Sequence, residues 1–70
     1  MEFIFTKHAR QRMYEKKITV EEVKATVNCG MKWPAKDAKN KDKWHAKMSA
    51  LEVVFERTGK YIIIITVYWE

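Results

Sequence analysis

The spacing of hydrophobic residues changes once along this chain, and that change limits the folds available to it. From Trp44 onward, apolar side chains alternate with polar ones, first as far as Met48 and then from Leu51 to Phe55. Alternation with a period of two is typical of β-strands that expose one face to water, so the second half of the chain is predicted to form a sheet. This period excludes a bundle made only of helices.

The last predicted strand spans residues 61–69, the longest apolar run of the chain, which is rich in β-branched isoleucine. Such a run is typical of a central strand covered on both faces. As an edge strand, it would instead be open to pairing with another chain. Thr58 and Gly59 predict the turn before this strand, and Ser49 with Ala50 predicts the turn before Leu51.

The first half of the chain is predicted to form two short helices. Thr6 can cap a first helix over residues 7–17, whose narrow apolar stripe consists of Ala9 and Met13. A very short joint at residues 17–19 would then make the two helices a hairpin.

The second predicted helix has the clearer start. Thr19 and Glu22 form a Thr-x-x-Glu capping box, and Ile18 and Val23 stand at the positions of a hydrophobic staple. Gly30 stands where the end of a helix favours a left-handed residue. The helix should therefore begin after Thr19 and end before Gly30.

Helices followed by strands indicate an α+β domain, with the N-terminal two-helix hairpin packed on one face of a three- to four-stranded, mainly antiparallel sheet. Residues 31–33 are predicted as a short strand that stops at Pro34, and another short strand can precede the first helix. Because 70 residues can bury only one core, residues 1–70 are predicted to form a single domain.

Positive charge is concentrated in the middle of the chain. The whole sequence carries a net charge of +5, and residues 31–47 hold six lysines but two acidic residues, with Trp33 and Trp44 among them. Lysines neutralise phosphates and an exposed indole can stack on an unpaired base, so this segment is a candidate RNA-binding surface. Alternatively, residues 35–43 form a mobile, solvated loop and both tryptophans belong to the core. The candidate nucleic-acid-binding residues are Lys32, Lys36, Lys39, Lys41, Lys43, Trp44 and Lys47.

The first helix carries a polar cluster, because His8 and Arg12 lie one turn apart on one face. The pair could hold a phosphate or orient a catalytic group. The alternative is structural: Arg12 pairs with Glu15, and His8 hydrogen bonds to the backbone at the start of the helix.

The predicted sheet offers groups suited to metal-free RNA cleavage, which needs a base, a cation and an acid around the phosphate. We rank Arg57 and Tyr68 first, followed by His45 and Lys47, and each could instead be a solvated strand residue or, for Tyr68, an aromatic at the edge of the core. The titratable groups expected on wet faces or strand ends are His45, Lys47, Glu52, Glu56, Arg57, Tyr61 and Tyr68.

Other chemistries lack their motifs. The sequence has no glycine-rich phosphate loop, no His-Glu-x-x-His and no Gly-x-Ser-x-Gly. Cys29 is the single cysteine, so an internal disulfide is excluded, and no Cys/His spacing suits zinc. We therefore expect no metal and no cofactor, and a small buried or half-buried Cys29. The absence of a signal-like N-terminus and of a long apolar run predicts a soluble, cytoplasmic protein without a membrane partner.

The segment from Phe5 to Val23, FTKHARQRMYEKKITVEEV, resembles the opening of a family of small bacterial and phage proteins with a His-Ala-x-x-Arg-Met helix. In this sequence the motif falls on His8, Ala9, Arg12 and Met13. That family looks related to the RelE/ParE-like toxin superfamily, which includes BrnT-type toxins. The strand pattern that ends in Ile-Thr-Val-Tyr extends the resemblance over nearly the whole chain.

The resemblance implies both a fold and an activity. Most such toxins with a known activity are ribonucleases that cut messenger RNA without a metal, often on the ribosome, whereas ParE-like members act on gyrase. Carried over to this chain, the helix motif implies site residues His8 and Arg12, and the basic strand residue and terminal tyrosine imply Arg57 and Tyr68. The expected function is therefore a RelE-like RNA endonuclease, the toxin of a toxin-antitoxin pair, with a cognate antitoxin as partner. The alternative is a non-catalytic regulatory module of phage or mobile-element origin that binds RNA or a host protein.

Overall fold

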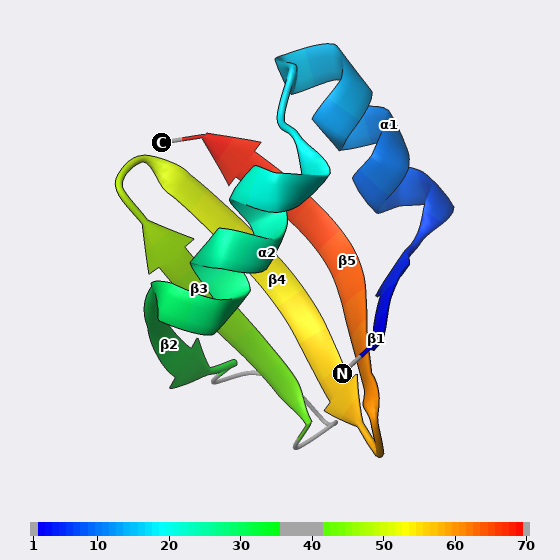
Figure 1. Ribbon diagram of the computed structural model, residues 1–70, viewed down its shortest axis with the longest axis vertical. Coiled ribbons are helices and arrows are strands. Elements are labelled where there is room, and N and C mark those ends of the chain that lie inside the picture. Colours follow the sequence, from blue (N-terminus) through cyan, green and yellow to red (C-terminus); the bar gives the residue numbers. More distant parts are fainter. Residues whose placement is uncertain (1, 36–41, 70) are drawn as a thin grey trace.

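The computed structural model describes residues 2–35 and 42–69, and these form two helices and a five-stranded sheet (Figure 1). Both helices lie on the same side of the sheet, so the predicted α+β class is confirmed. In the described part of the chain, no helix is long and apolar enough to cross a membrane. The elements in chain order are β1 (Glu2–Phe5), α1 (Lys7–Lys16), α2 (Val20–Cys29), β2 (Met31–Pro34), β3 (Lys43–Met48), β4 (Leu51–Thr58) and β5 (Tyr61–Trp69).

The sheet has more strands than predicted, and its pairing is mixed. Its spatial order is β1-β5-β4-β3-β2, with antiparallel pairing throughout except where β1 runs parallel to β5. Strand β1 pairs from Glu2 opposite Tyr61 to Phe5 opposite Ile64. The four residues of β1 meet a strand almost sixty positions away, so no local pattern in the sequence could reveal this partner.

Strand β5 lies inside the sheet, between β1 and β4, and the edge alternative is therefore wrong. The prediction that it is covered on both faces is also wrong, because both helices lie on one side (Figure 1). Ile62 and Ile64 are buried beneath the helices, while Ile63 and Ile65 are half-buried.

A β-bulge interrupts the pairing of β4 with β5. Val54 lies opposite Thr66, but the next residue of β4, Phe55, lies opposite Ile64, so Ile65 is an extra residue in β5. The bulge reverses the alternation of side chains beyond it. Ile64 and Val67 are therefore both in the core, although three positions separate them.

The start of α1 is tied to this bulge. The Thr6 side chain accepts a hydrogen bond from the Ala9 amide at 3.1 Å and donates one to the carbonyl of Ile65 at 3.0 Å. Thr6 thus caps the helix, as predicted, and also satisfies a backbone group of the bulge. Ala9 and Met13 are both buried, which confirms the predicted stripe.

The predicted capping box of α2 is present. The Thr19 amide donates to Glu22 Oε1 at 2.9 Å, and the Glu22 amide donates to Thr19 Oγ1 at 3.1 Å. Ile18 and Val23 are buried on either side of it, at the positions predicted for the staple.

Gly30 does not adopt the predicted left-handed conformation; its φ of −75° and ψ of 170° are extended. A Cβ atom there would lie 2.5 Å from the Thr26 carbonyl oxygen and 2.6 Å from that of Lys47. Glycine is therefore required by the close approach of α2 to β3. Among residues 2–35 and 42–69, Lys17 is left-handed and ends α1 with φ 56°. Ser49 and Gly59 are also left-handed and lie in the two predicted turns.

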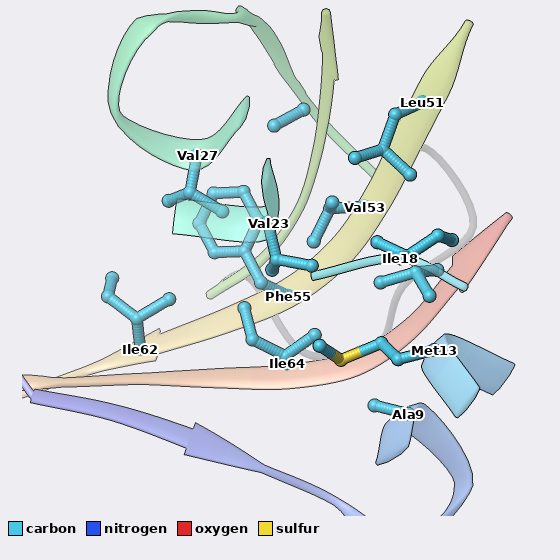
Figure 2. Close-up of a cluster of buried hydrophobic side chains, with 12 residues drawn as sticks. Ala9, Met13, Ile18, Val23, Val27, Leu51, Val53, Phe55, Ile62 and Ile64 are labelled. Atoms are coloured by element: carbon cyan, nitrogen blue, oxygen red, sulfur yellow. The ribbon is translucent and has the colours of Figure 1, made fainter. Parts of the chain in front are cut away.

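One hydrophobic core lies between the helices and the sheet (Figure 2). Side chains from α1 and α2 meet the strands around Phe55 and Ile64, which are 2% and 0% exposed. Burying each large side chain stabilises the fold by about 1.5–3 kcal/mol. Cys29 is exposed, contrary to the prediction, because it is the last residue of α2 and lies outside this core.

Candidate functional site

The sheet has two faces with different chemistry. Ala46, Val53 and Val67 point toward the helices and belong to the core, so the side chains between them point to the other face. We call this second face the open face, because neither helix packs on it. It carries Trp33 of β2, His45 and Lys47 of β3, Glu52 of β4 and Tyr68 of β5, which are cross-strand neighbours.

Glu52 is the centre of a hydrogen-bonded cluster on the open face. Its Oε2 atom lies 2.9 Å from Nδ1 of His45 and also accepts a hydrogen bond from the Tyr68 hydroxyl. When Glu52 is ionised its carboxylate can only accept, and the imidazole then donates from Nδ1. Nε2 of neutral His45 is then left with a lone pair, which is the form required of a base.

Glu52 is also buried, with 6% of its surface exposed, and it is the one buried charged side chain among residues 2–35 and 42–69. Removing a carboxylate from water costs free energy unless hydrogen bonds compensate. Within the described residues, every buried side-chain nitrogen or oxygen has a hydrogen-bond partner. The cluster is therefore satisfied, and it holds His45 and Tyr68 in fixed positions.

Trp33 stacks on the imidazole of His45. The ring centroids are 5.3 Å apart and the ring planes are parallel to within 1°. The two residues are paired across β2 and β3. The side chain of His45 is 23% exposed. Glu52 contacts the edge of its imidazole ring through a hydrogen bond, and the indole of Trp33 covers one face of the ring.

Two of the predicted lysines share this face with His45. Lys43 and Lys47 stand two residues before and after it on β3, opposite Glu56 and Glu52 of β4. The open face thus combines a histidine and an indole with two lysines, each of which lies opposite a glutamate.

Three other predicted residues of the strands, Lys32, Trp44 and Arg57, point to the helix side. Arg57 lies opposite Ile62, Trp44 opposite Phe55 and Lys32 opposite Ala46. Trp44 is partly buried and packs against the core, as the alternative interpretation predicted. The structure does not bring Arg57 together with Tyr68, because the two side chains point to opposite faces of the sheet.

The polar residues of α1 lie away from the open-face cluster, on a helix that packs against β5 from the helix side. Arg12 forms an ion pair with Glu15 at 3.9 Å, as the structural alternative predicted. His8 is exposed, and the predicted backbone hydrogen bond of its side chain is not formed with any described residue. Lys36, Lys39 and Lys41, and most of the predicted mobile loop, lie outside the described residues.

Two members of the cluster were underrated from the sequence. The sequence offers Glu52 as one of seven titratable candidates, and it favours Trp44 over Trp33 as the binding indole. A usable signal existed for Glu52, since a carboxylate inside the apolar run Leu51–Phe55 must find hydrogen bonds.

The chain is thus an α+β domain with two helices on one face of a mixed sheet and a carboxylate-centred cluster on the other. A family model described as "Domain of unknown function (DUF4258)" matches residues 5–69, and the chain belongs to this family. No curated protein and no solved structure matches it. In residues 2–35 and 42–69, no three His, Cys, Asp or Glu side chains are grouped so that they could hold a metal ion.

Proposed function

We propose that this protein is a metal-independent RNA endonuclease whose active centre is the His45–Glu52–Tyr68 cluster of the open face. The observation that carries the proposal is the pair of hydrogen bonds on Glu52 Oε2, which fix the tautomer and the orientation of His45. An imidazole held in this way is suited to general base catalysis.

In the proposed reaction, Nε2 of His45 takes the proton of an RNA 2′-hydroxyl. The 2′ oxygen forms a bond to phosphorus, the bond from phosphorus to the 5′ oxygen breaks, and that oxygen takes a proton from water. The products are a 2′,3′-cyclic phosphate and a 5′-hydroxyl end. Glu52 stabilises the imidazolium that forms, and Lys47 supplies positive charge for the pentavalent phosphate.

The remaining residues act by position. The Tyr68 hydroxyl holds the Glu52 carboxylate from β5, opposite the side from which His45 approaches it. Trp33 holds the imidazole with one face of its indole, and we assign its other face to an unpaired base. Arg57, His8 and Arg12 lie outside this centre.

The test is to map new RNA 5′ ends by primer extension. Purified protein is added to free RNA containing EDTA and, separately, to a bacterial translating extract in which the RNA carries ribosomes. We expect wild-type protein to produce new ends in at least one arm, His45→Ala to produce none, and Glu52→Gln to cleave more slowly. Arg10→Ala, which removes an exposed cation on α1, is the control and should cleave like wild type.

Two results would contradict the proposal. One is a folded wild-type protein that produces no new ends in either arm. The other is a His45→Ala variant that cleaves at the wild-type rate, because the base would then lie elsewhere.

A second candidate function is RNA binding without turnover, and the stack of Trp33 on His45 between two lysines favours it as the alternative. Binding of single-stranded RNA should then weaken with salt, with a log-log slope of about −0.7 per phosphate contacted. Salt-dependent binding without new RNA ends would support this alternative over the endonuclease.

The proposal extends to a toxin neutralised by an antitoxin, and this part rests on the family resemblance alone. Induced expression in bacteria should arrest growth, and His45→Ala should relieve the arrest. An arrest that persists in this variant would point to a host protein, in place of RNA, as the target.

A further inference from the structure

A second concave site lies on the helix side of the sheet. It is a hollow of about 360 Å³ where the C-terminal end of α2 meets one end of β3, β4 and β5. Its volume lies at the lower end of the range of about 300–1,000 Å³ that is usual for small-molecule sites. The open-face cluster contributes no residue to it.

The inner wall of the hollow is apolar. Phe55 and Ile62 are each 2% exposed and Val27 is 6% exposed, so they form a fixed floor. The half-buried indole of Trp44, paired with Phe55 across β3 and β4, forms a side. Two aromatic rings at one hollow favour a ligand with a flat ring, which can pack against them face to face or edge to face.

The rim of the hollow is cationic. Lys32 and Arg57 line it together with the amide of Asn28, and no carboxylate of a described residue does so. The Lys32 ammonium donates to the Gly30 carbonyl at 3.1 Å, so it already compensates the carbonyls at the end of α2. The Arg57 guanidinium forms no ion pair with any described side chain. With respect to residues 2–35 and 42–69, Arg57 therefore keeps the two parallel donors with which a guanidinium binds an anion.

We propose that this hollow binds a small aromatic anion. The ring lies between Trp44 and the floor of Phe55 and Ile62, and the anionic group, a carboxylate or a phosphate, binds Arg57 with Lys32 beside it. The guanidinium fork fits either oxyanion, so the ring and the charge together define the ligand class. The site is separate from the proposed active centre and does not depend on it.

The test is a titration of ¹⁵N-labelled protein followed through its indole N–H signals. The probes are benzoate and phenyl phosphate, with benzyl alcohol as the ring without the charge and inorganic phosphate as the charge without the ring. Trp44→Phe assigns the Trp44 signal. We expect a saturable shift of this signal with both ring-bearing anions, an unmoved Trp33 signal, and much weaker effects of the two partial probes.

Arg57→Gln should lower the affinity for the ring-bearing anions by about tenfold, the loss typical of a charge-assisted hydrogen bond. Arg10→Gln removes the same charge from the exposed surface of α1 and should leave the affinity unchanged. A tighter fit of phenyl phosphate or of benzoate assigns the anion as phosphate or carboxylate.

Three outcomes would overturn the proposal. The first is the absence of a saturable shift at Trp44 with both ring-bearing anions. The second is equal affinity of Arg57→Gln and wild type. The third is equal binding of benzyl alcohol, because the hollow would then be an apolar cavity without anion recognition.

Discussion

Trp33 and His45, on neighbouring strands, stack with their ring planes parallel to within 1° and their centroids 5.3 Å apart. The stack places an indole beside the histidine whose other contact is the buried carboxylate of Glu52. Two of the three tryptophans therefore have different roles: Trp33 belongs to the open face, and Trp44 packs against the core.

Replacing Trp33 by alanine should weaken the binding of single-stranded RNA. Loss of one stacked base costs ~1–3 kcal/mol, so we expect the affinity to fall by about 5- to 150-fold. Fluorescence anisotropy with a labelled oligonucleotide at fixed salt measures this change. Trp69→Phe alters an indole that contacts α1 through the Lys16 carbonyl, and it serves as the control. Equal losses in both variants, or none in Trp33→Ala, would show that Trp33 does not stack on RNA.

Removing the Glu52 carboxylate should destabilise the fold. In Glu52→Ala, the half-buried donors of His45 and Tyr68 lose their acceptor, which costs about 1–3 kcal/mol of unfolding free energy. Glu52→Gln keeps an acceptor oxygen and should lose less. Urea denaturation gives these values. Glu15→Ala, which removes an exposed ion pair with Arg12, should change the stability by less than about 1 kcal/mol. A Glu52→Ala variant as stable as this control would contradict the structural role of the cluster.

The two glycines should respond differently to alanine. In Gly30→Ala the new Cβ would meet two backbone carbonyl oxygens at 2.5 and 2.6 Å, so α2 and β3 must separate, at a cost of about 1–3 kcal/mol or more. In Gly59→Ala the added atom meets nothing within 4 Å, and the left-handed φ of +55° costs about 1–2 kcal/mol. Thermal unfolding compares them. A fully tolerated Gly30→Ala would disprove the close approach.

Lys17 ends α1 in the left-handed conformation, which glycine adopts without the steric cost of a Cβ. Lys17→Gly should therefore be more stable than Lys17→Ala by about 1 kcal/mol. Both variants lose the lysine charge. The difference between their free energies of unfolding, measured by urea denaturation, therefore reports the cost of the left-handed backbone conformation. The opposite order would mean that the end of α1 is helical in solution.

Local chemistry made part of this structure predictable. Thr6, Thr19 and Glu22 cap helices within three residues of themselves, and the turns at Ser49 and Gly59 lie where the period-two segments end. Strand β1 escaped prediction as a fifth, parallel strand because its partner is distant. Cys29 is exposed and not buried as predicted, because it lies outside the core. Gly30 is extended and not left-handed as predicted, and glycine is needed there because the backbone lies against β3.

The candidate site was predictable in its residue types but not in its grouping. The sequence predicts His45 and Tyr68 as site residues, and in the structure Glu52 hydrogen bonds to both. On β4, simple alternation places Glu52 and Arg57 on opposite faces of the sheet, because the two residues are five positions apart. The same count fails on β5, where the extra residue changes the parity between Ile62 and Tyr68.

The extra residue, Ile65, has a consequence for the start of α1 and none for the pairing of the cluster. Deleting this one codon would join Ile64 directly to Thr66 in a regular ladder, with Phe55 opposite Ile64 and Val54 opposite Thr66, and Tyr68 would stay opposite Glu52 on the open face. Thr6 donates a hydrogen bond to the carbonyl of Ile65, so the deletion would remove this contact between the N-terminus of α1 and the bulge. In this chain, the loss of one residue from the last strand would therefore disturb the cap of α1 and leave the residues of the open face in register.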